Sequence, residues 1–326
     1  MSRRTGHVVT LGETMVLLHP LDTEPLRSSR QLAVSVAGAD SNFAIAMTRL
    51  GWPAIWLSAV SEDPLGDLVV ERVGGAGVDV SLVRRDPDHR TGVFFKFREA
   101  GHTRVLYYRG DSAASHFNPD WLEPSLFETA AVLHLNGVTC ALSQSCAASV
   151  ARALALAKQH HVRVSLDVNL RLQLWDLERA RAALMPLFPQ VDVVLGTEEE
   201  LLALSGSAAL DEALTVIAQC GPTVVVAKRG PLGAVALAGG QRVDHPGFVP
   251  PAVVDEVGAG DGFAAGFVSA FLRGAIVEEA LSHGNLVGAA ATTVADDSSG
   301  YPTQAQLEAW LKAWPKREPS APPAAG

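Results

Sequence analysis

The feature that most constrains the fold is the alternation of short β-branched segments with longer amphipathic segments along the chain. Six short segments have the apolar composition of strands that are buried on both faces: residues 8–11, 54–60, 131–135, 162–168, 191–195 and 223–227. Helical periodicity occupies residues 41–50, 66–77, 143–160, 176–187 and 209–220. Because two parallel strands need a long crossover, usually a helix, this order predicts an α/β fold with a mostly parallel sheet and helices on both faces.

Two stretches interrupt this order, residues 14–37 and 91–111, and neither contains a good helical pattern. Residues 92–108 alternate between apolar and polar side chains around a turn at 99–102, which is typical of a hairpin. We therefore expect a main α/β domain from residues 1–13, 38–90 and 112–314, and a small sheet from the two interrupting stretches. The Pro- and Ala-rich tail, residues 315–326, is expected to be disordered.

Composition and charge narrow the classes of function. The 326 residues carry 26 Lys and Arg against 35 Asp and Glu, a formal charge of −9, which argues against a nucleic-acid-binding protein. No apolar segment is long enough to span a membrane, and the N-terminus lacks the apolar region of a signal peptide. We therefore expect a cytoplasmic protein without a membrane partner. Three cysteines without CxxC spacing predict neither a disulfide framework nor a zinc site.

The most informative segment is residues 253–263, where a glycine-rich turn leads directly into a helical pattern. Gly258 and Gly260 permit unusual backbone angles and a close approach of the backbone to a ligand. The N–H groups that open a helix have no intrahelical partner and lie at the positive end of the helix dipole. The turn is therefore a predicted binding site for a phosphate, or for a phosphoryl group during its transfer.

Asp261 lies inside this predicted anion site, where a carboxylate would repel a resting phosphate. Its presence is explained if it faces the attacking hydroxyl and accepts the proton of that group; the alternative is an ordinary helix cap. Two other glycine motifs are excluded. The chain has no Gly-Lys dipeptide for a Walker A loop, and the third glycine of a dinucleotide fingerprint is missing.

Two motifs in this order resemble the signatures of the ribokinase-like (PfkB) family of carbohydrate kinases. Residues 255–261, Asp-Glu-Val-Gly-Ala-Gly-Asp, are similar to the C-terminal signature Asp-Thr-x-Gly-Ala-Gly-Asp, with Glu in place of Thr. Residues 37–44 are similar to the N-terminal signature, a Gly-Gly-x-x-x-Asn element that opens a helix. The resemblance implies a three-layer αβα domain with a small β-sheet lid. It also implies a kinase with Asp261 as the catalytic base and the amides of Gly258, Ala259 and Gly260 as the anion hole.

The resemblance further implies how cofactors bind. The expected cofactors are ATP and Mg²⁺, with K⁺ as a further candidate. Glu200 matches an element that acts near Mg²⁺ through water, although Thr197 stands where the family has Asn. Asp255 is the candidate ligand for a monovalent cation. The candidate nucleotide-binding residues all lie in the C-terminal half: Thr197, Lys228, Gly230, Gly233, Gly258, Gly260 and Asn285.

Within the family, the sequence most resembles the 2-keto-3-deoxygluconate kinases. The residues expected to contact the sugar are Gly38, Ala39, Asp40, Asn42, Phe94, Tyr107, Arg109, Asn169, Arg171 and Asp261. Arg109 and Arg171 come from separate segments, and their planar guanidinium groups suit the carboxylate of a sugar acid. The alternative is that either Arg pairs with a protein carboxylate. Phe94 and Phe95 stand where the acid-sugar kinases usually have Tyr, which removes a hydroxyl donor.

Other functions stay open on the sequence alone. A fructokinase or ribokinase that acts on a neutral sugar is the nearest alternative, and a nucleoside kinase is a more distant one. Outside the class, the alternatives are a sensor that binds sugar and nucleotide without turnover and an NAD-dependent oxidoreductase. The expected partner is a small-molecule sugar or sugar acid. Alternating apolar residues in the small sheet, such as Phe95 and Phe97, fit a homodimer formed through the lid, which we expect, and equally a lid that rests on its own domain.

Overall fold

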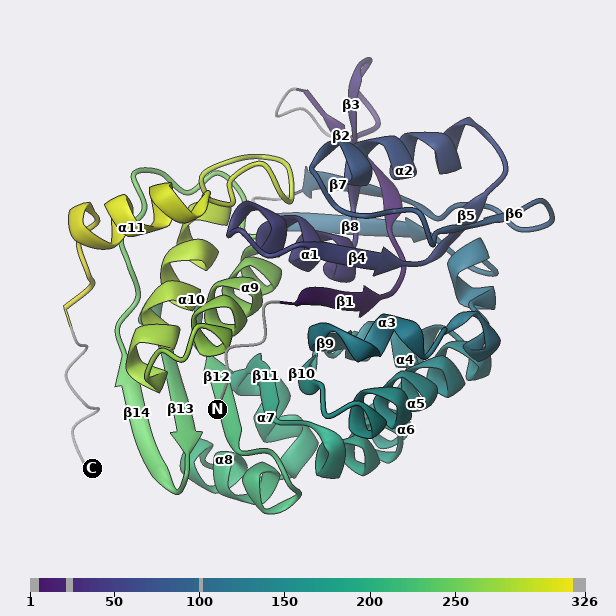
Figure 1. Ribbon diagram of the computed structural model, residues 1–326. Helices are drawn as coiled ribbons and strands as arrows, with labels where there is room; N and C mark the ends of the chain where they lie inside the picture. Colours follow the sequence, from purple (N-terminus) through teal and green to yellow (C-terminus); the bar gives the residue numbers. More distant parts are fainter. Residues whose placement is uncertain (1–5, 22–25, 100–101, 319–326) are drawn as a thin grey trace.

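The computed structural model describes residues 6–21, 26–99 and 102–318 (Figure 1). Its centre is an eight-stranded sheet with the strand order β14-β13-β12-β11-β10-β9-β1-β4. The strands are β1 (His7–Leu11), β4 (Ala54–Leu57), β9 (Ala130–Asn136), β10 (Arg163–Asp167), β11 (Val193–Thr197), β12 (Val224–Lys228), β13 (Ala234–Ala238) and β14 (Gln241–His245). The strands from β4 to β12 in this order run parallel and overlap the six apolar segments in which we expected strands.

Both faces of this sheet are buried, which explains why its strands are apolar throughout. In β11, Val193 and Leu195 belong to one hydrophobic cluster and Val194 belongs to another, because successive side chains point to opposite faces. The first cluster includes residues of α1 (Ala39–Arg49), α2 (Pro64–Gly75), α9 (Ala259–Leu272), α10 (Val277–Ala291) and α11 (Gln304–Ala313). The second includes residues of α3 (Ser125–Glu128), α4 (Gly137–Leu142), α5 (Gln144–Gln159), α6 (Leu177–Leu184), α7 (Glu198–Ser205) and α8 (Leu210–Gln219).

The two sets of helices lie on opposite sides of the sheet in Figure 1, so the predicted α/β fold class with three layers is confirmed. Short 3₁₀ turns complete the connections: η1 (Ala113–His116), η2 (Pro119–Trp121), η3 (Met185–Gln190) and η4 (Gly230–Leu232). No single helix of the described ranges is long and apolar enough to cross a membrane. Only α7 and α8 together reach that length and composition, and they are bent by 61° at their junction.

A second, four-stranded sheet comes from the two stretches that interrupt the main fold, and we call it the small sheet. Its strands are β2 (Met15–Pro20), β3 (Leu32–Ala37), β7 (Val93–Glu99) and β8 (His102–Tyr108), in the order β3-β2-β7-β8. One face carries a third hydrophobic cluster that includes Leu17 and Phe94. The opposite face contributes Val16 to the cluster that contains α2. Figure 1 shows the small sheet beside α2, at the end of the molecule where β1 and β4 lie.

Several details differ from the sequence predictions, which also lacked the helices α10 and α11. The segment at 54–60 is divided, because β5 (Ala59–Ser61) leaves the main sheet and pairs with β6 (Arg84–Asp86). We did not predict β13 and β14, an antiparallel hairpin whose turn uses Gly239 and Gly240 at positive φ. Residues 315–317 begin the tail that we expected to be disordered, but they hydrogen-bond to residues 247–249. The last eight residues, 319–326, lie outside the described part of the chain.

Candidate active site

The candidate site lies where the parallel strands end, beside the start of α9. Asn136, Asp167, Thr197 and Lys228 are the last residues of four neighbouring strands, β9 to β12. Parallel strands present their carboxyl ends at one edge of a sheet, and open α/β sheets bind ligands at that edge. The Lys228 Nζ atom is 3.4 Å from the position that a Cβ atom on Gly260 would take. The first turn of α9 therefore faces the same edge as the strand ends.

The backbone of the glycine-rich turn depends on Gly258. This residue caps α9 with φ +82° and ψ −13°, in the left-handed region. A Cβ atom on it would lie 2.2 Å from the carbonyl oxygen of Asp297, so only glycine fits. The Tyr301 hydroxyl donates to the Gly258 carbonyl at 2.9 Å. Of the three candidate amides, that of Ala259 already donates to Glu256 O at 3.3 Å, which leaves Gly258 and Gly260 as the better anion donors.

Asp261 lies in the first turn of α9 and is held by one amide. Asn42 Nδ2 in α1 donates to Asp261 Oδ2 at 2.8 Å, so the two resemblance motifs meet at this hydrogen bond. Burial raises the pKa of Asp261 to about 7, and the charge of Asp167 adds to this effect. The Asn42 hydrogen bond and the positive charges of Lys228 and Arg171 act in the opposite direction. A carboxyl group with this pKa is suited to accept a proton near neutral pH.

Lys228 and Asp167 form a buried ion pair beneath the start of α9. The Lys228 Nζ atom is 2.6 Å from Asp167 Oδ2, and both side chains are nearly inaccessible to solvent. Burial alone would lower the pKa of Lys228, but Asp167 and Glu200 outweigh it and raise that pKa above its ordinary value. The other carboxylate oxygen, Asp167 Oδ1, is buried and has no hydrogen-bond partner among the described residues. The site thus contains one unsatisfied anionic oxygen next to a fixed positive charge.

Glu200, the predicted magnesium residue, is oriented by the backbone. It lies at the third position of α7 and forms a capping box with Thr197, the residue before the helix. Its two carboxylate oxygens accept from Leu170 N at 2.7 Å and from Thr197 N at 2.8 Å. Burial raises the pKa of Glu200, and the charge of Lys228 opposes this. Thr197 and Glu200 therefore lie together next to the Lys228–Asp167 pair, although both act in capping α7.

The N-terminal motif places a second acidic residue in the site. Gly38 caps α1 in extended conformation, and a Cβ atom on it would lie 2.2 Å from Glu13 O; Ala39 is the first residue of the helix. Asp40 is buried, and its two oxygens accept from Thr10 Oγ1 at 2.9 Å and from Thr139 Oγ1 at 3.3 Å. Burial raises the pKa of Asp40 to about 8 against the effect of these hydrogen bonds.

The small sheet presents Phe94 and Tyr107 side by side. They are paired residues on β7 and β8 with ring centroids 5.5 Å apart, on the face that carries the third hydrophobic cluster. The Arg109 guanidinium lies 5.6 Å from the centre of the Tyr107 ring and forms an ion pair with Glu13. Glu13 is almost completely buried. The sequence argument that Arg109 has a charge free for a sugar acid therefore does not hold, because the structure gives it a carboxylate partner.

The segment after β10 carries the remaining sugar candidates. Asn169 is buried with φ +37°, an uncommon backbone angle for a residue other than glycine. Arg171 is exposed and forms no ion pair with any described residue. It nevertheless lies close enough to Asp261 to lower the pKa of that carboxyl group. Arg171 is thus placed near the candidate base with an unpaired charge.

The predicted nucleotide residues form a second group around residues 245–247. Asn285 Nδ2 lies 3.0 Å from His245 Nδ1 and donates to His245 O at 3.3 Å. Gly233 has φ +95°, and a Cβ atom on it would lie 2.1 Å from the same carbonyl oxygen. Gly230 also has a positive φ, +53°, and no atom lies within 4 Å of its Cβ position. Gly233 and Asn285 are thus brought together, whereas Gly230 borders open space.

Asp255, the predicted ligand of a monovalent cation, has a protein partner instead. Its Oδ2 atom is 2.8 Å from Nζ of Lys96, a buried lysine of β7 that also contacts Asp297 at 2.7 Å. The expectation of a free cation site at Asp255 is therefore corrected: the described residues already place an ammonium group there.

Comparison with known proteins shows the family of this chain. The model of the pfkB family carbohydrate kinases matches residues 5–304. The chain belongs to the pfkB family of carbohydrate kinases. A 2-dehydro-3-deoxygalactonokinase of Haloferax volcanii is 36% identical, covering 90% of this chain and 93% of its own. A 2-dehydro-3-deoxygluconokinase of Thermoproteus tenax is 34% identical, and the match covers 92% of this chain and 93% of that protein. The crystal structure of a PfkB protein from Polaromonas sp. JS666 superposes with a TM-score of 0.84, at 33% identity over 93% of this chain and 99% of that one.

For a pfkB kinase, the sequence reasoning missed several residues that support the predicted ones. Asp167 is the most important, and its position at the end of an apolar strand was an available signal. Thr10 and Thr139, which hold Asp40, are polar residues inside otherwise apolar segments. Glu13 and Lys96 gave no signal, because their partners are distant in sequence.

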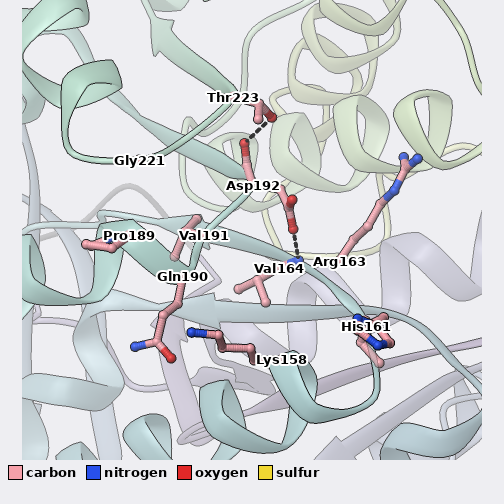
Figure 2. A pocket seen from close by; sticks show the side chains of 11 residues that line it. Lys158, His161, Arg163, Val164, Pro189, Gln190, Val191, Asp192, Gly221 and Thr223 are labelled. Atoms are coloured by element: carbon pink, nitrogen blue, oxygen red, sulfur yellow. Dashed lines mark hydrogen bonds between the residues drawn. The ribbon is translucent and has the colours of Figure 1, made fainter.

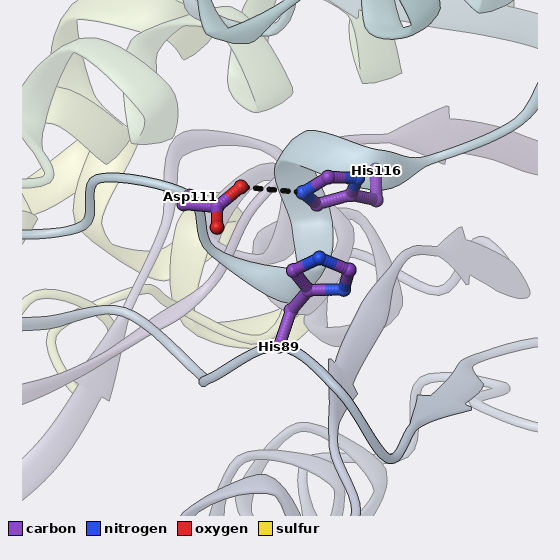
Figure 3. A group of neighbouring side chains, drawn as sticks. All are labelled: His89, Asp111 and His116. Carbon is purple, nitrogen blue, oxygen red and sulfur yellow. Dashed lines mark hydrogen bonds and ion pairs between the residues drawn. The ribbon is translucent and has the colours of Figure 1, made fainter.

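Two further features of the kinase lie outside the candidate site. Figure 2 shows a pocket where β10 and β11 begin, at the opposite edge of the sheet. In this pocket the Asp192 carboxylate accepts a hydrogen bond from Val164 N at 2.7 Å, and Thr223 Oγ1 donates to the Asp192 carbonyl oxygen at 3.0 Å. The side chains of His89, Asp111 and His116 lie close together (Figure 3), and their possible ligand atoms are within 4.8 Å of one another. His116 already pairs with Asp111 at 2.6 Å, and His89 with Asp86 at 2.9 Å.

Proposed function

We propose that this kinase transfers the γ-phosphate of ATP to the terminal hydroxyl group of a 2-keto-3-deoxy sugar acid, with Asp261 as the base. The relatives named for 2-dehydro-3-deoxygluconate and 2-dehydro-3-deoxygalactonate support this substrate class. The single observation that carries the proposal is Arg171, an exposed arginine that forms no ion pair with a described residue and whose charge lowers the pKa of the candidate base. A bound carboxylate would satisfy this charge through two parallel hydrogen bonds.

The chain's own residues divide the work of the transfer. Asp261 accepts the proton of the attacking hydroxyl, while Asn42 fixes the direction of its carboxylate at 2.8 Å. The amides that open α9 at Gly258 and Gly260 lie at the positive end of the helix dipole and stabilise negative charge in the transition state. Lys228 holds its charge beside Gly260, where it attracts phosphate oxygens. The base and the anion site lie on the same helix turn, which would bring the attacking hydroxyl close to the phosphoryl group.

The donor set fits ATP with Mg²⁺. Mg²⁺ prefers carboxylate oxygens and keeps several waters, and Asp167 Oδ1 is a buried carboxylate oxygen without a partner among the described residues. Glu200 lies next to Asp167 and would act through water, since both its oxygens accept from backbone amides. When bound, ATP would supply the phosphoryl group and Mg²⁺ would neutralise its developing negative charge. Thr197, Gly230, Gly233 and Asn285 would border the nucleotide.

Phe94 and Tyr107 would cover the sugar from the small sheet. Phe94 has no hydroxyl group, but Tyr107, the residue paired with it on β8, does have one. Asp40, whose pKa is raised in part by the charge of Asp261, and Asn169, in the segment after β10, are buried polar residues that would bind sugar hydroxyls. The acids in the names of these two relatives, 2-dehydro-3-deoxygalactonate and 2-dehydro-3-deoxygluconate, are epimers at one carbon, so both belong in the assay.

The test is a panel of sugars assayed for ADP release with ATP and Mg²⁺: 2-keto-3-deoxygluconate, 2-keto-3-deoxygalactonate, gluconate, fructose and ribose. Arg171→Ala is expected to raise KM for the preferred acid at least about tenfold with little change in kcat, because it removes a charged hydrogen bond worth about 1.5–3 kcal/mol. Arg179→Ala, another exposed arginine in α6, is the control and should leave KM unchanged. A wild-type preference for fructose or ribose, or an unchanged KM in Arg171→Ala, contradicts the acid substrate.

One observation favours a neutral sugar. The Arg109–Glu13 ion pair removes one of the two charges expected for an acid, and a fructokinase or ribokinase would need neither. The same panel separates the two substrate classes. Absence of ADP release with every sugar, despite nucleotide binding, would support the sensor without turnover.

We also propose a homodimer formed through the small sheet. One row of paired apolar residues crosses its four strands, Val34, Leu18, Phe95 and Leu106, and the two end members are 47% and 44% exposed. Exposed apolar rows of this kind are commonly covered by a partner. Sedimentation of the wild type and of Leu106→Glu tests this, since the variant should dissociate. The use of ATP, which is abundant inside cells, agrees with the cytoplasmic location that we expect.

A further inference from the structure

Lys96 is a buried lysine whose three N–H donors each have an oxygen acceptor. Its Nζ atom is 2.8 Å from Asp255 Oδ2, 2.7 Å from Asp297 Oδ1 and 3.0 Å from the carbonyl oxygen of Ala295. Its side chain is 5% exposed, and those of Asp255 and Asp297 are 14% and 3% exposed. An ammonium group has three donors and no acceptor, so this arrangement satisfies Lys96 completely.

The oxygens around Lys96 belong to two segments that shape the glycine-rich turn. Asp255 precedes the turn, and its other carboxylate oxygen accepts from Val257 N at 3.1 Å. The carbonyl oxygen of Asp297 lies against Gly258, 2.2 Å from the position that a Cβ atom on Gly258 would take. The Lys96 ammonium therefore joins the segment that enters the turn to the segment that packs against it.

Two buried carboxylates in one place need a positive charge. Without one, both would pay the cost of burial and of mutual repulsion. Either a bound monovalent cation or a lysine supplies one unit of charge to oxygen ligands, and both cannot occupy the same position. Although burial opposes it, the charges of Asp297 and Asp255 raise the pKa of Lys96, so the ammonium form is maintained at neutral pH.

Lys96 also connects the small sheet to the turn. It is two residues after Phe94 on β7, so both side chains point to the same face of the small sheet. The strand that would cover the sugar thus contributes the charge that holds the anion hole. A cation taken from solvent would make no such connection.

We propose that the Lys96 ammonium replaces an exchangeable monovalent cation in this kinase, so that its glycine-rich turn is organised without K⁺ and is fixed to the small sheet by its own chain. The activity part of this inference rests on the proposed function, whereas the stability part does not.

The experiment compares the wild type, Lys96→Ala, Lys96→Met and the control Lys158→Ala in KCl, NH₄Cl, NaCl and tetramethylammonium chloride at equal ionic strength. Lys158 is an exposed lysine of α5, remote from the site. Thermal unfolding without substrate is one readout, and kcat with the preferred sugar is the other. The wild type and Lys158→Ala should have the same Tm in all four salts and rates that agree within about twofold. Lys96→Ala should have a lower Tm, and K⁺ or NH₄⁺ should raise it and restore kcat by at least about tenfold relative to tetramethylammonium. Lys96→Met, whose side chain fills the space, should respond less.

Several outcomes overturn the proposal. Activation of the wild type by K⁺ over tetramethylammonium would show that the cation site is still exchangeable, and this test needs no variant to fold. A Lys96→Ala protein that is stable and active in every salt would show that no cation is needed. One that is equally impaired in every salt would show an ordinary ion pair. If no sugar is phosphorylated, the proposed function fails, but the Tm measurements still decide the role of Lys96.

Discussion

Asp261→Asn should abolish turnover and stabilise the protein at the same time. The carboxylate of Asp261 is costly to ionise in the folded protein, because burial raises its pKa from 3.8 to about 7. The Asn side chain has no charge to desolvate and keeps an oxygen that accepts from Asn42. We expect kcat to fall by several orders of magnitude, since the proton acceptor is lost.

The size of the stability effect follows from the pKa shift and depends on pH. A carboxyl group whose pKa is raised on folding costs nothing below its unfolded pKa, and the penalty grows until the pH exceeds the folded pKa. With pKa values of 3.8 and about 7, the penalty is about 1.7 kcal/mol near pH 5 and about 4 kcal/mol near pH 8. The unfolding free energy of Asp261→Asn relative to the wild type should therefore increase by roughly 2–3 kcal/mol between these pH values.

Urea unfolding of both proteins near pH 5 and near pH 8 measures this difference, and circular dichroism confirms that the variant is folded. Asp120→Asn, an exposed aspartate in η2, is the control and should show the same difference from the wild type at both pH values. A variant that is less stable than the wild type at the higher pH would refute the reasoning, because it would show that the carboxylate is stabilised by its neighbours. Near wild-type turnover would refute the assignment of Asp261 as the base.

Two further predictions concern the framework of the site. Arg109→Met should destabilise the protein by about 3–5 kcal/mol in urea unfolding, because it leaves the buried Glu13 carboxylate unpaired. Adding Glu13→Gln to this variant should recover much of the lost stability. If the losses of the two single variants add up in the double variant, the two residues do not pair directly. Gly258→Ala should lower both Tm and kcat, since φ is positive at this residue and the new Cβ would lie 2.2 Å from Asp297 O. Gly260→Ala should lower kcat with little change in Tm, because its Cβ would lie 3.4 Å from Lys228 Nζ. Equal stability losses in the two glycine variants would show that the turn is not held as described.

The parallel sheet was predictable because its physical cause is visible in the sequence. A strand buried on both faces must be apolar at every position, and segments such as 191–195 have this composition between amphipathic stretches. β14 escaped prediction because it lies at the sheet edge, where Gln241 and Arg242 are exposed, so no apolar run marks it. The glycine-rich turn was also readable, since the requirement for glycine at 258 is local.

The charge pairs of the site were not predictable, because each joins residues from distant elements. Glu13 follows β1 and Arg109 follows β8, and nothing in the sequence around either residue indicates that the two form a pair. Lys96 lies in an alternating strand where a charged residue normally faces solvent, yet it is buried against Asp255. Propensity and periodicity describe one element at a time, whereas such pairs depend on how two elements are packed.

These pairs change the argument for an acidic substrate from a count of charges to the position of one residue. Three basic residues were predicted for the site, and the structure neutralises two of them: Lys228 by Asp167 and Arg109 by Glu13. A basic residue that already has a protein carboxylate as its partner gives no evidence for a carboxylate on the substrate, so an excess of Lys and Arg near the strand ends would not distinguish an acid from a neutral sugar. Arg171 does distinguish them, since it is exposed, forms no ion pair with the described residues and acts electrostatically on Asp261. If the carboxylate of a sugar acid binds Arg171, as proposed above, reversing that charge with Arg171→Glu should penalise acids far more than neutral sugars.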